Sequence, residues 1–525
     1  MKSKISITLA LLFFATLTAS SQSSLDAYGG LSGSNFQAPA VPPPAAPAIT
    51  SNFFAMDVSG RFCCSTSDPW PWTGISAETG TTFGTYRTLG TGVSWASISP
   101  CPPTDTLAAC TTYLGGHAPA TWTCNAAGRC YNWGDSSHGS TLDYYILMAQ
   151  ANHEAIMVTA WGTPSWDANT SGGCSASSGA CVPLDIASGD TSWKNFITDL
   201  ITHEGAGKIK YLEIWNEPNV HASFWEGTDT QLVTLVSDGS TAAKAADSAI
   251  LVISPPVTAD VVTSGCSPID PYLATLLADG MASHVDIIGF HGYVSLLGTY
   301  PALDASCVNT VISGVRADLS AAGVAGGKPI YDTEDSWGTG ANSVINPGEN
   351  SSLNEEFSFT GIDYLIQASN TACSSTPCYP MTGMSWYGWD FEGSTGTFWD
   401  PVSGDTCAFP PPSGTAAPCL TNAGVAYVNL YKWLVGATAA APCTFNSTTS
   451  VWTCNFTRTS PTGYQAQAVW SSASSCSSGC SYTYPSGAKW ERTLTSVPPA
   501  TETALSGGHV TIGYIPILLE TAKLP

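Results

Sequence analysis

Charged residues are scarce in this sequence, and positive charge is the scarcest. Only 10% of the 525 residues are charged, and 16 Lys and Arg face 39 Asp and Glu, so the formal net charge is −23. An acidic surface repels the phosphates of nucleic acids and the headgroups of anionic membranes. We therefore expect neither nucleic acid nor a membrane among the partners of this protein.

Several familiar motifs are also missing. No Gly-rich phosphate loop follows the first predicted strand, which argues against a doubly wound sheet that binds a dinucleotide. No group of Cys and His residues has the spacing of a zinc site. Internal repeats, which a structural protein of the cell wall would show, are absent as well. We expect neither an organic cofactor nor a metal ion.

Long apolar runs are limited to the N-terminus. Lys2 and Lys4 precede the run Ile5–Leu17, and small residues follow up to Ser21, a pattern typical of a secretory signal peptide over residues 1–21. No later segment is long enough to span a bilayer. We therefore expect a soluble protein that is secreted, either to the outside or to a periplasm.

All 18 cysteines lie beyond this signal, and their even number fits disulfide bonds in an oxidising compartment. Sequence spacing alone cannot fix the pairing. The closest neighbours predict five local bridges: Cys174–Cys181, Cys373–Cys378, Cys407–Cys419, Cys443–Cys454 and Cys476–Cys480.

The chain beyond the signal divides into three parts by composition. Residues 22–50 are rich in Pro, Ser and Gly and predict a linker. Residues 51–436 alternate β-type and helical segments, which favours βα units around a parallel sheet. Residues 437–525 contain short Thr-, Ser- and aromatic-rich strands and predict a β-sandwich. Whether residues 40–50 add a strand to it stays open.

Eight segments in the central part have strand character, so we expect a (β/α)8 barrel over 51–436. A doubly wound open sheet is the alternative. The expected strands are Phe53–Val58, Thr82–Thr88, Ala155–Ala160, Ile209–Trp215, Ile250–Ser254, Val285–Phe290, Pro329–Thr333 and Gly383–Tyr387. The expected helices are 141–153, 191–203, 229–247, 270–279, 308–322, 354–369 and 423–435. The expected C-terminal strands are Val451–Thr457, Gln465–Trp470, Lys489–Leu494 and Val510–Leu519.

The segment Lys210–Asn219 ends the fourth expected strand with the residues Trp215-Asn-Glu-Pro218. Proline cannot continue the hydrogen-bond ladder of a central strand, so Asn216 and Glu217 are displayed at the strand end. Barrel enzymes build their sites at this end. The insertions 90–138 and 162–190 follow the second and third strands and should lie on the same side.

A second carboxylate stands at a matching place. Glu334 ends the seventh expected strand, 117 positions after Glu217, and the intervening chain holds three βα units. The two side chains should therefore meet across the mouth of the barrel. A single Glu at a strand end is more often part of a salt bridge or a cap. Two of them fit the pair of carboxyl groups that glycoside hydrolysis needs.

These motifs resemble clan A of the glycoside hydrolases, which are retaining enzymes on (β/α)8 barrels, and most closely family 39 with its β-xylosidases and α-iduronidases. The resemblance rests on Trp215-Asn-Glu-Pro218 and Thr333-Glu334. Three further segments support it: Trp161-Gly-Thr-Pro-Ser-Trp166, Gly289-Phe-His-Gly-Tyr293 and Trp386-Tyr-Gly-Trp389. The resemblance implies that Glu217 is the acid/base and Glu334 the nucleophile.

The residues around the pair fit these implied roles. Arg87 is the only one of six arginines on an expected barrel strand, and a buried Arg needs a carboxylate partner, for which we choose Glu334. Tyr293 should donate to the same carboxylate, which must stay ionised. His291 should orient Glu217 or bind sugar hydroxyls, although a core role is nearly as plausible. Asn216 should donate to the sugar 2-hydroxyl.

Other polar and aromatic residues near the pair are harder to place. We expect structural roles for Asp332, which has the strand parity of Glu334 and could point inward one layer deeper, and for Asp335, for which a rim contact is the alternative. Glu213 should be hydrogen-bonded in the core. Trp386 or Trp389 is the best candidate for a platform on which a sugar ring stacks. The remaining candidates for substrate contact or support are Trp161 and Trp337.

The leading interpretation is a secreted retaining glycosidase that cleaves a β-linked oligosaccharide or polysaccharide, the β linkage being implied by the resemblance alone. The rival interpretation is a non-catalytic carbohydrate-binding protein that kept the barrel. The presence of both Glu217 and Glu334 argues against the rival, because loss of activity usually removes one of the two.

Overall fold

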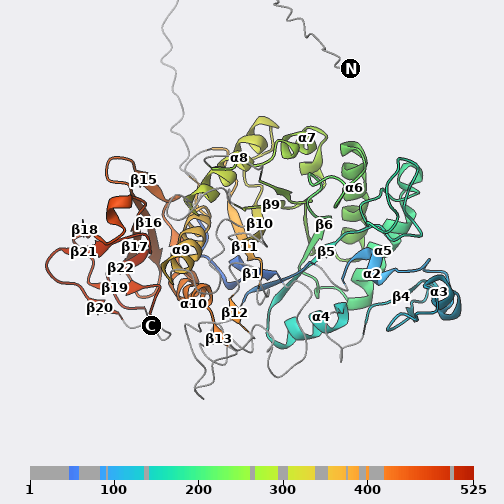
Figure 1. The fold of residues 1–525 in the computed structure, drawn as a ribbon, viewed down its shortest axis with the longest axis horizontal. Coiled ribbons are helices and arrows are strands. Elements are labelled where there is room, and N and C mark those ends of the chain that lie inside the picture. The colour runs from blue at the N-terminus through green and yellow to red at the C-terminus, as the bar shows by residue number, and fades with distance from the viewer. Residues whose placement is uncertain are drawn as a thin grey trace, which may run out of the picture. The chain divides into compact units, whose positions relative to one another are not determined.

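The computed structural model describes residues 46–57, 83–89, 93–134, 141–259, 266–293, 305–336, 353–373, 376–388, 398–400, 419–496 and 502–524 (Figure 1). The predicted signal peptide, most of the linker, and the residues Trp337, Trp389 and Cys407 lie outside these ranges. Within them, no helix combines the length and the apolar character that crossing a bilayer requires.

A parallel sheet of nine strands forms the centre of the fold, in the order β7-β6-β5-β2-β1-β11-β10-β9-β8. All eight predicted strands are present in it, most of them shorter than expected. Their bounds are β1 Phe54–Asp57, β2 Thr85–Thr88, β5 Ala155–Ala160, β6 Tyr211–Ile214, β7 Leu251–Ile253, β9 Ile288–His291, β10 Ile330–Asp335 and β11 Met381–Trp386, and the ninth strand is β8, Val257–Thr258.

The two ends of this sheet meet. A parallel bridge joins Ile253, in β7, to Ile287, just before β9, and the short β8 pairs with β9. The sheet is therefore curled in the manner of a TIM barrel.

Helices cover the outside of the curled sheet, and each begins and ends close to its predicted bounds (Figure 1). Side chains of Thr228 and Thr421 cap α6 and α10. Thr228, for example, accepts a hydrogen bond from the backbone of Gln231 and forms a capping box before α6. The helices are α4 Leu142–Ala151, α5 Thr191–Glu204, α6 Asp229–Ala246, α7 Tyr272–Ala278, α8 Val308–Ala321, α9 Leu353–Ser369 and α10 Asn422–Leu434.

Side chains of alternate strand residues fill the inside of the curl. Ala55, Met157, Tyr211, Ile253, Ile287 and Tyr331 form one buried cluster there. Gly383 faces the same space, since a Cβ at this position would lie 2.2 Å from the ring of Tyr331. Because successive residues of a strand point to opposite faces, this cluster fixes which positions reach the site above it.

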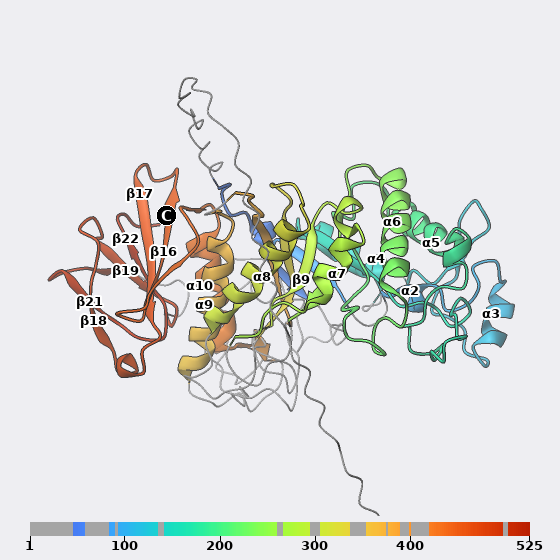
Figure 2. The same ribbon diagram turned by 90° about the horizontal axis from the view of Figure 1, so that it is seen from above.

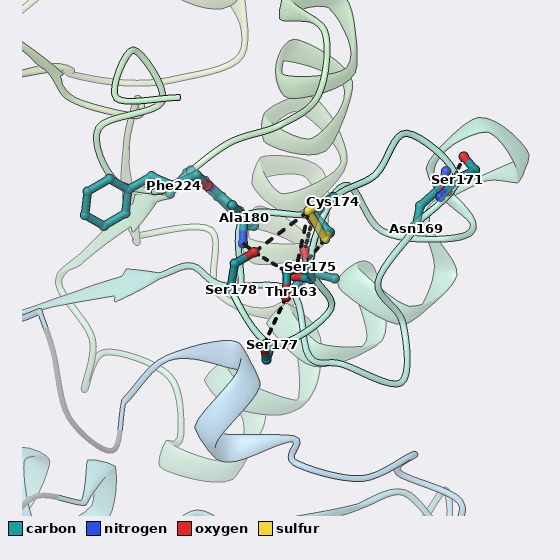
Figure 3. The surroundings of a disulfide bond; sticks show 11 residues. Thr163, Asn169, Ser171, Cys174, Ser175, Ser177, Ser178, Ala180 and Phe224 are labelled. Carbon is teal, nitrogen blue, oxygen red and sulfur yellow. Dashed lines mark hydrogen bonds between the residues drawn. A yellow bond between two sulfur atoms is a disulfide. The ribbon is translucent and has the colours of Figure 1, made fainter. Parts of the chain in front are cut away.

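Disulfides fasten the two insertions that follow β2 and β5. Cys101–Cys110 and Cys124–Cys130 close loops of the first insertion, around the short helix α3, Leu107–Tyr113. Cys174–Cys181 closes the second (Figure 3), where Ser178 Oγ donates to the carbonyl of Ser175. Four of the five predicted bridges are present, while the fifth involves Cys407. The other disulfides of the described residues are Cys266–Cys307, Cys373–Cys378, Cys443–Cys454 and Cys476–Cys480.

The C-terminal part consists of antiparallel sheets. Its main sheet runs β14-β16-β17-β22-β19-β20, with β15 paired to β16, and β18 pairs with β21. The predicted strand Val510–Leu519 is wrong as one unit, because the chain passes from the two-stranded sheet, in β21, to the main sheet, in β22. The bounds are β14 Thr438–Ala439, β15 Thr444–Asn446, β16 Val451–Arg458, β17 Tyr464–Ser471, β18 Cys480–Thr483, β19 Trp490–Thr493, β20 Thr503–Ala504, β21 His509–Ile512 and β22 Ile517–Glu520.

This C-terminal part contacts the neighbouring helices α9 and α10, which lie side by side (Figure 2). Arg458 donates from Nη1 to the carbonyl of Val435, and Ser358 Oγ donates to the carbonyl of Tyr514. Residues 46–50 form no strand, although Ile49 donates to the carbonyl of Ala437 and accepts from Gly436.

Candidate active site

Glu217 stands on a strained turn directly after β6. Trp215 and Glu217 have φ angles of 70° and 36°, in the left-handed region that costs a non-glycine residue about 1–3 kcal/mol. The indole of Trp215 holds this turn in place, because it is fully buried and donates from Nε1 to the carbonyl of Phe224 at 2.6 Å. Strain of this kind is concentrated at functional sites.

Glu334 reaches the inside of the barrel through a β-bulge in β10. Opposite β9, Asp332 pairs with Phe290 but Glu334 pairs with His291, so two steps on β10 match one step on β9. The extra residue reverses the alternation of side chains beyond Asp332. As a result Glu334 faces the site while Asp332 faces outward.

The carboxylate of Glu334 is buried and fully hydrogen-bonded. Arg87 donates from Nη1 to Oε2, and the hydroxyl of Tyr293 donates to Oε1, each at 2.7 Å. Burial by itself would raise the pKa of Glu334, but the charges of His291 and Arg87 and the bond from Tyr293 outweigh it and lower the pKa. The ionised form of Glu334 is therefore favoured.

Arg87 is shared among several side chains. Besides Glu334, its guanidinium contacts Asp57 Oδ2 at 2.5 Å, Glu213 Oε2 at 2.7 Å and Asn216 Oδ1 at 2.9 Å. Burial, together with Glu334 and Glu213, raises the pKa of Asp57 despite Arg87 beside it. This shift favours the neutral form of Asp57, and a neutral Asp57 would leave the cation to the two glutamates. Because Asn216 accepts from Arg87 through its oxygen, its amide nitrogen is left for a ligand.

His291 lies between the two glutamates. Its Nδ1 is 2.7 Å from Glu217 Oε1 and its Nε2 is 3.7 Å from Glu334 Oε2, and its ring is fully buried. Burial lowers the pKa of His291, but Glu334 and Glu217 more than compensate and the net pKa is raised. One carboxylate oxygen of Glu217 lies within 4.8 Å of one of Glu334.

A metal ion does not fit this group. Glu217, His291 and Glu334 would offer one ligand atom each, all within 4.8 Å of one another. Both oxygens of Glu334 are already taken by Arg87 and Tyr293, and the guanidinium at 2.7 Å would repel a cation. A second group of three potential ligands lies nearer the surface: Asp143, His203 and Glu204.

Three further carboxyl groups are buried behind Glu334. Gln367, on α9, donates from Nε2 to Asp332 at 2.8 Å, Asp335 at 2.9 Å and Asp363 at 3.1 Å. Burial raises the pKa of Asp332 to about 7 and of Asp363 to about 8, and it raises that of Asp335 too. Asp332 and Asp335 therefore have the structural roles expected of them, but Asp332 does not point inward and Asp335 is not a contact at the rim.

This carboxyl cluster lies in close contact with Gly292, the residue before Tyr293. A Cβ at Gly292 would lie 2.0 Å from Asp332 Oδ2 and 2.6 Å from Asp335 Oδ2. The backbone of Gly292 donates to Asp332 Oδ1 at 3.0 Å. Only glycine fits here, and its position sets that of the next residue, which bonds Glu334.

The predicted tryptophans differ in their outcome. Trp386 is fully buried and its ring stacks on Tyr364 at 5.7 Å and Phe398 at 5.0 Å, so the prediction that it forms a sugar platform is wrong. Trp386 stands at a position of β11 whose side chain points to the outside of the barrel. Trp161 directly follows β5 and packs its ring on Phe224 at 5.5 Å. Trp337 and Trp389 lie outside the described residues.

Three residues of the site were missed in the sequence. Asp57 is the last residue of β1, and Thr159 is the last but one of β5. Both side chains face the inside of the barrel, where Thr159 donates to Glu213 at 2.8 Å. The position of each residue near the C-terminal end of an expected strand could have indicated that it belongs to the site. Tyr387, with the inward parity that Trp386 lacks, is partly exposed and its phenol lies near that of Tyr293.

No protein-family model and no curated protein matches this sequence. Solved structures do match. A conserved exported protein from Bacteroides fragilis is 12% identical, with a TM-score of 0.54 over 91% of this chain and 98% of that one. A family 39 glycoside hydrolase from the gut symbiont Bacteroides cellulosilyticus WH2 is 12% identical, with a TM-score of 0.52 over 90% and 82%. A glucosidase from Croceicoccus marinus is 11% identical, with a TM-score of 0.50 over 90% and 99%.

At these identities the similarity concerns the fold. One of these structural neighbours is a glycoside hydrolase of family 39. The resemblance to clan A, and within it to family 39, that the motifs of the sequence predicted is confirmed at the level of the fold.

Proposed function

We propose that this protein is a retaining glycoside hydrolase that cleaves O-glycosidic bonds through a covalent glycosyl-enzyme. The observation that carries the proposal is the approach of Glu217 and Glu334 to within 4.8 Å at their nearest ligand atoms. Retaining enzymes hold their two carboxyl groups about 5–5.5 Å apart, whereas inverting enzymes leave about 6.5–9.5 Å for a water molecule.

In the first step the carboxylate of Glu334 attacks the anomeric carbon, and Glu217 gives its proton to the leaving glycosidic oxygen. The bond from the anomeric carbon to that oxygen breaks as an ester to Glu334 forms. The lowered pKa of Glu334 supports its role as the attacking group. The 16% exposure of the Glu217 side chain lets it reach a substrate.

In the second step Glu217 takes a proton from water, and the resulting hydroxide oxygen attacks the anomeric carbon and displaces Glu334. Two inversions give net retention. His291 holds Glu217 through the 2.7 Å contact and orients it in both steps. Asn216, held by Arg87, presents its amide nitrogen to the sugar 2-hydroxyl.

We further propose a closed (β/α)8 barrel over residues 51–436, a β-sandwich over 437–525 and secretion directed by residues 1–21. The seven disulfides among the described residues and the exported neighbour from Bacteroides fragilis support a location outside the cytoplasm. The substrate is a neutral β-linked oligosaccharide or polysaccharide, such as a xyloside, a galactoside or a hemicellulose fragment, and no cofactor takes part.

A panel of aryl glycosides and plant polysaccharides, followed by proton NMR of the first product, tests this proposal. Release of the sugar with its original anomeric configuration is expected, and the rate should be unchanged by a chelator. First release of the opposite anomer would overturn the retaining mechanism. Binding of a polysaccharide without hydrolysis of any substrate would instead favour the non-catalytic carbohydrate-binding protein.

A further inference from the structure

The side chain of Asn219, two residues beyond Glu217, is bonded at both ends within the protein. Its Oδ1 accepts a hydrogen bond from the backbone N–H of Thr258, in β8, and its Nδ2 donates to Asp270 Oδ2, each at 3.2 Å. The indole of Trp215 holds the strained turn on the side before Glu217. Asn219 attaches the same turn on the side after it. Strained backbone persists only where the surrounding structure determines it fully.

The two partners of Asn219 are themselves joined to each other. Asp270 donates from its backbone N–H to the carbonyl of Thr258 at 3.4 Å, and its Oδ1 accepts from the backbone of Tyr272, at the start of α7, at 2.8 Å. An antiparallel bridge also connects the residue that follows β8 to the residue that precedes Asp270. The amide of Asn219 is therefore attached to one unit, which consists of β8 and the start of α7.

The same unit also holds the carboxyl group of Glu217. In the pairing of β8 with β9, Thr258 lies directly beside His291, whose Nδ1 is 2.7 Å from Glu217 Oε1. A closed ring of contacts results. It runs from the carboxyl of Glu217 through His291 to Thr258. From Thr258 it passes through Asn219 and returns along the chain to Glu217. The backbone and the carboxyl of Glu217 are thus fixed to the same pair of strands.

Glu334 is held by a different set of bonds. It lies on β10, and its carboxylate accepts from Arg87 and Tyr293, neither of which contacts Asn219 through a hydrogen bond. A change at Asn219 should therefore move the proton donor relative to the nucleophile. A misplacement of about 1 Å in a catalytic site can lower the rate about a hundredfold.

We propose that Asn219 is a positioning residue, which holds Glu217 where it can protonate the leaving glycosidic oxygen. The inference rests on the proposed function, because it requires Glu217 to be the acid/base. It adds a residue that lies outside Trp215-Asn-Glu-Pro218, the motif on which the family resemblance depends. Asn219 acts through the bonds to Thr258 and Asp270 rather than on the sugar.

The test compares two glycosides of the sugar that the wild type prefers, a phenyl glycoside and a dinitrophenyl glycoside. The full-chain variant Asn219→Ala should lose about tenfold to a hundredfold in kcat/KM on the phenyl glycoside, whose leaving group needs a proton. It should lose far less on the dinitrophenyl glycoside, whose leaving group needs little protonation. Asn152→Ala is the matched control, because that amide also bonds within the protein, to the carbonyl of Met148 at 2.8 Å, and should change neither value.

An exchange of donor and acceptor tests the bond itself. Asn219→Asp keeps the acceptor for Thr258 but places a second carboxylate against Asp270, and Asp270→Asn places a second amide nitrogen against Asn219. Each single variant should lose kcat/KM on the phenyl glycoside. The double variant Asn219→Asp/Asp270→Asn restores one donor and one acceptor, so it should recover most of the loss. Thermal unfolding checks that every variant is folded at the assay temperature.

The outcomes separate the positioning role from the proposed hydrolysis. Equal losses of Asn219→Ala on the two glycosides, or a double variant no more active than Asn219→Asp, would overturn the positioning role and leave the hydrolysis in place. If the wild type cleaves neither glycoside, or if Glu217→Gln cleaves the phenyl glycoside as fast as the wild type, the proposed function fails and the positioning role fails with it.

Discussion

Arg87 and Glu334 form a buried ion pair, with Nη1 and Oε2 2.7 Å apart, and the same guanidinium also contacts Asp57 and Glu213. Three carboxyl groups around one cation would leave an excess of buried negative charge if all were ionised, and that is costly. Burial, and then the two glutamates, raise the pKa of Asp57, which favours its neutral form and so reduces the excess. The Arg87 cation then stabilises the carboxylate that we propose as the nucleophile.

This charge balance predicts opposite outcomes for two substitutions. Arg87→Met leaves Glu213 and Glu334 buried without a cation, so the free energy of unfolding should fall by about 3–5 kcal/mol and activity should be lost. Asp57→Asn replaces one neutral group by another, so kcat should change by less than about tenfold, a difference of 1.36 kcal/mol. Denaturant titration and steady-state kinetics measure both. A loss of activity in Asp57→Asn as large as that in Arg87→Met would show that Asp57 acts as an anion.

The proton donor makes a second prediction, which depends on the leaving group. Glu217→Gln cannot protonate the departing oxygen, so kcat/KM on natural substrate should fall about 10²–10⁴-fold. Aryl glycosides with acidic leaving groups need little protonation and should lose less in the first step. Added azide, which needs no general base to attack, should restore part of their turnover. Activity of Glu217→Gln on natural substrate near that of the wild type would exclude the acid/base role.

The carboxyl cluster behind Glu334 predicts how stability changes with pH. Burial raises the pKa of Asp363 to about 8 in the folded state, whereas the unfolded value is about 3.9. The folded protein thus keeps a proton that the unfolded chain releases, and the free energy of unfolding falls as pH rises between the two values, by about 1.4 kcal/mol per pH unit for each such proton.

Asp363→Asn removes one of these protons while keeping an acceptor for Gln367. Its unfolding free energy should fall less steeply with pH than that of the wild type, measured by urea titration between about pH 4.5 and 6. His291, whose pKa is also raised, is present in both proteins, so any slope that it adds is common to the two. Equal slopes for the two proteins would contradict the protonated state of the cluster.

The alternation of β11 predicts which aromatic residue touches the sugar. Tyr387→Ala should raise KM about fivefold to tenfold, because it removes a ring–sugar contact, with stability nearly unchanged. Trp386→Ala should instead lower the free energy of unfolding by about 3–5 kcal/mol, since its ring is fully buried between Tyr364 and Phe398. Kinetics and thermal unfolding of the two variants decide the matter, and a KM effect confined to Trp386→Ala would reverse the assignment.

Much of the fold could be predicted because its signals are local. Period-two runs such as Ala155–Ala160 and helical runs such as Thr191–Glu204 are written in consecutive residues, and the structure keeps both within a residue of their predicted bounds. The proline after Glu217 marks the end of β6 in the same way. The contacts of Arg87 and Tyr293 with Glu334 followed from strand order, because strand ends in a barrel meet at one face.

The bulge in β10 could not be predicted, since nothing in Asp332-Thr-Glu-Asp335 shows where the partner strand shifts its register. Because of the bulge, Asp332 points outward rather than inward, and Asp335 is buried rather than at the rim. Their partner Gln367 lies on α9, more than 30 residues away, and only packing brings it close. For Trp386 the signal is local, because the side chains of β11 alternate between the inside and the outside of the barrel and Trp386 falls on an outward position.

The central claim is that Glu334 attacks the sugar. A 2-deoxy-2-fluoroglycoside with a good leaving group traps the covalent intermediate, and mass mapping of the digested protein then locates the modified residue. The account predicts stoichiometric inactivation, with the label on Glu334 and none in the Glu334→Gln variant. A label on Asp332 or Asp335 would contradict it.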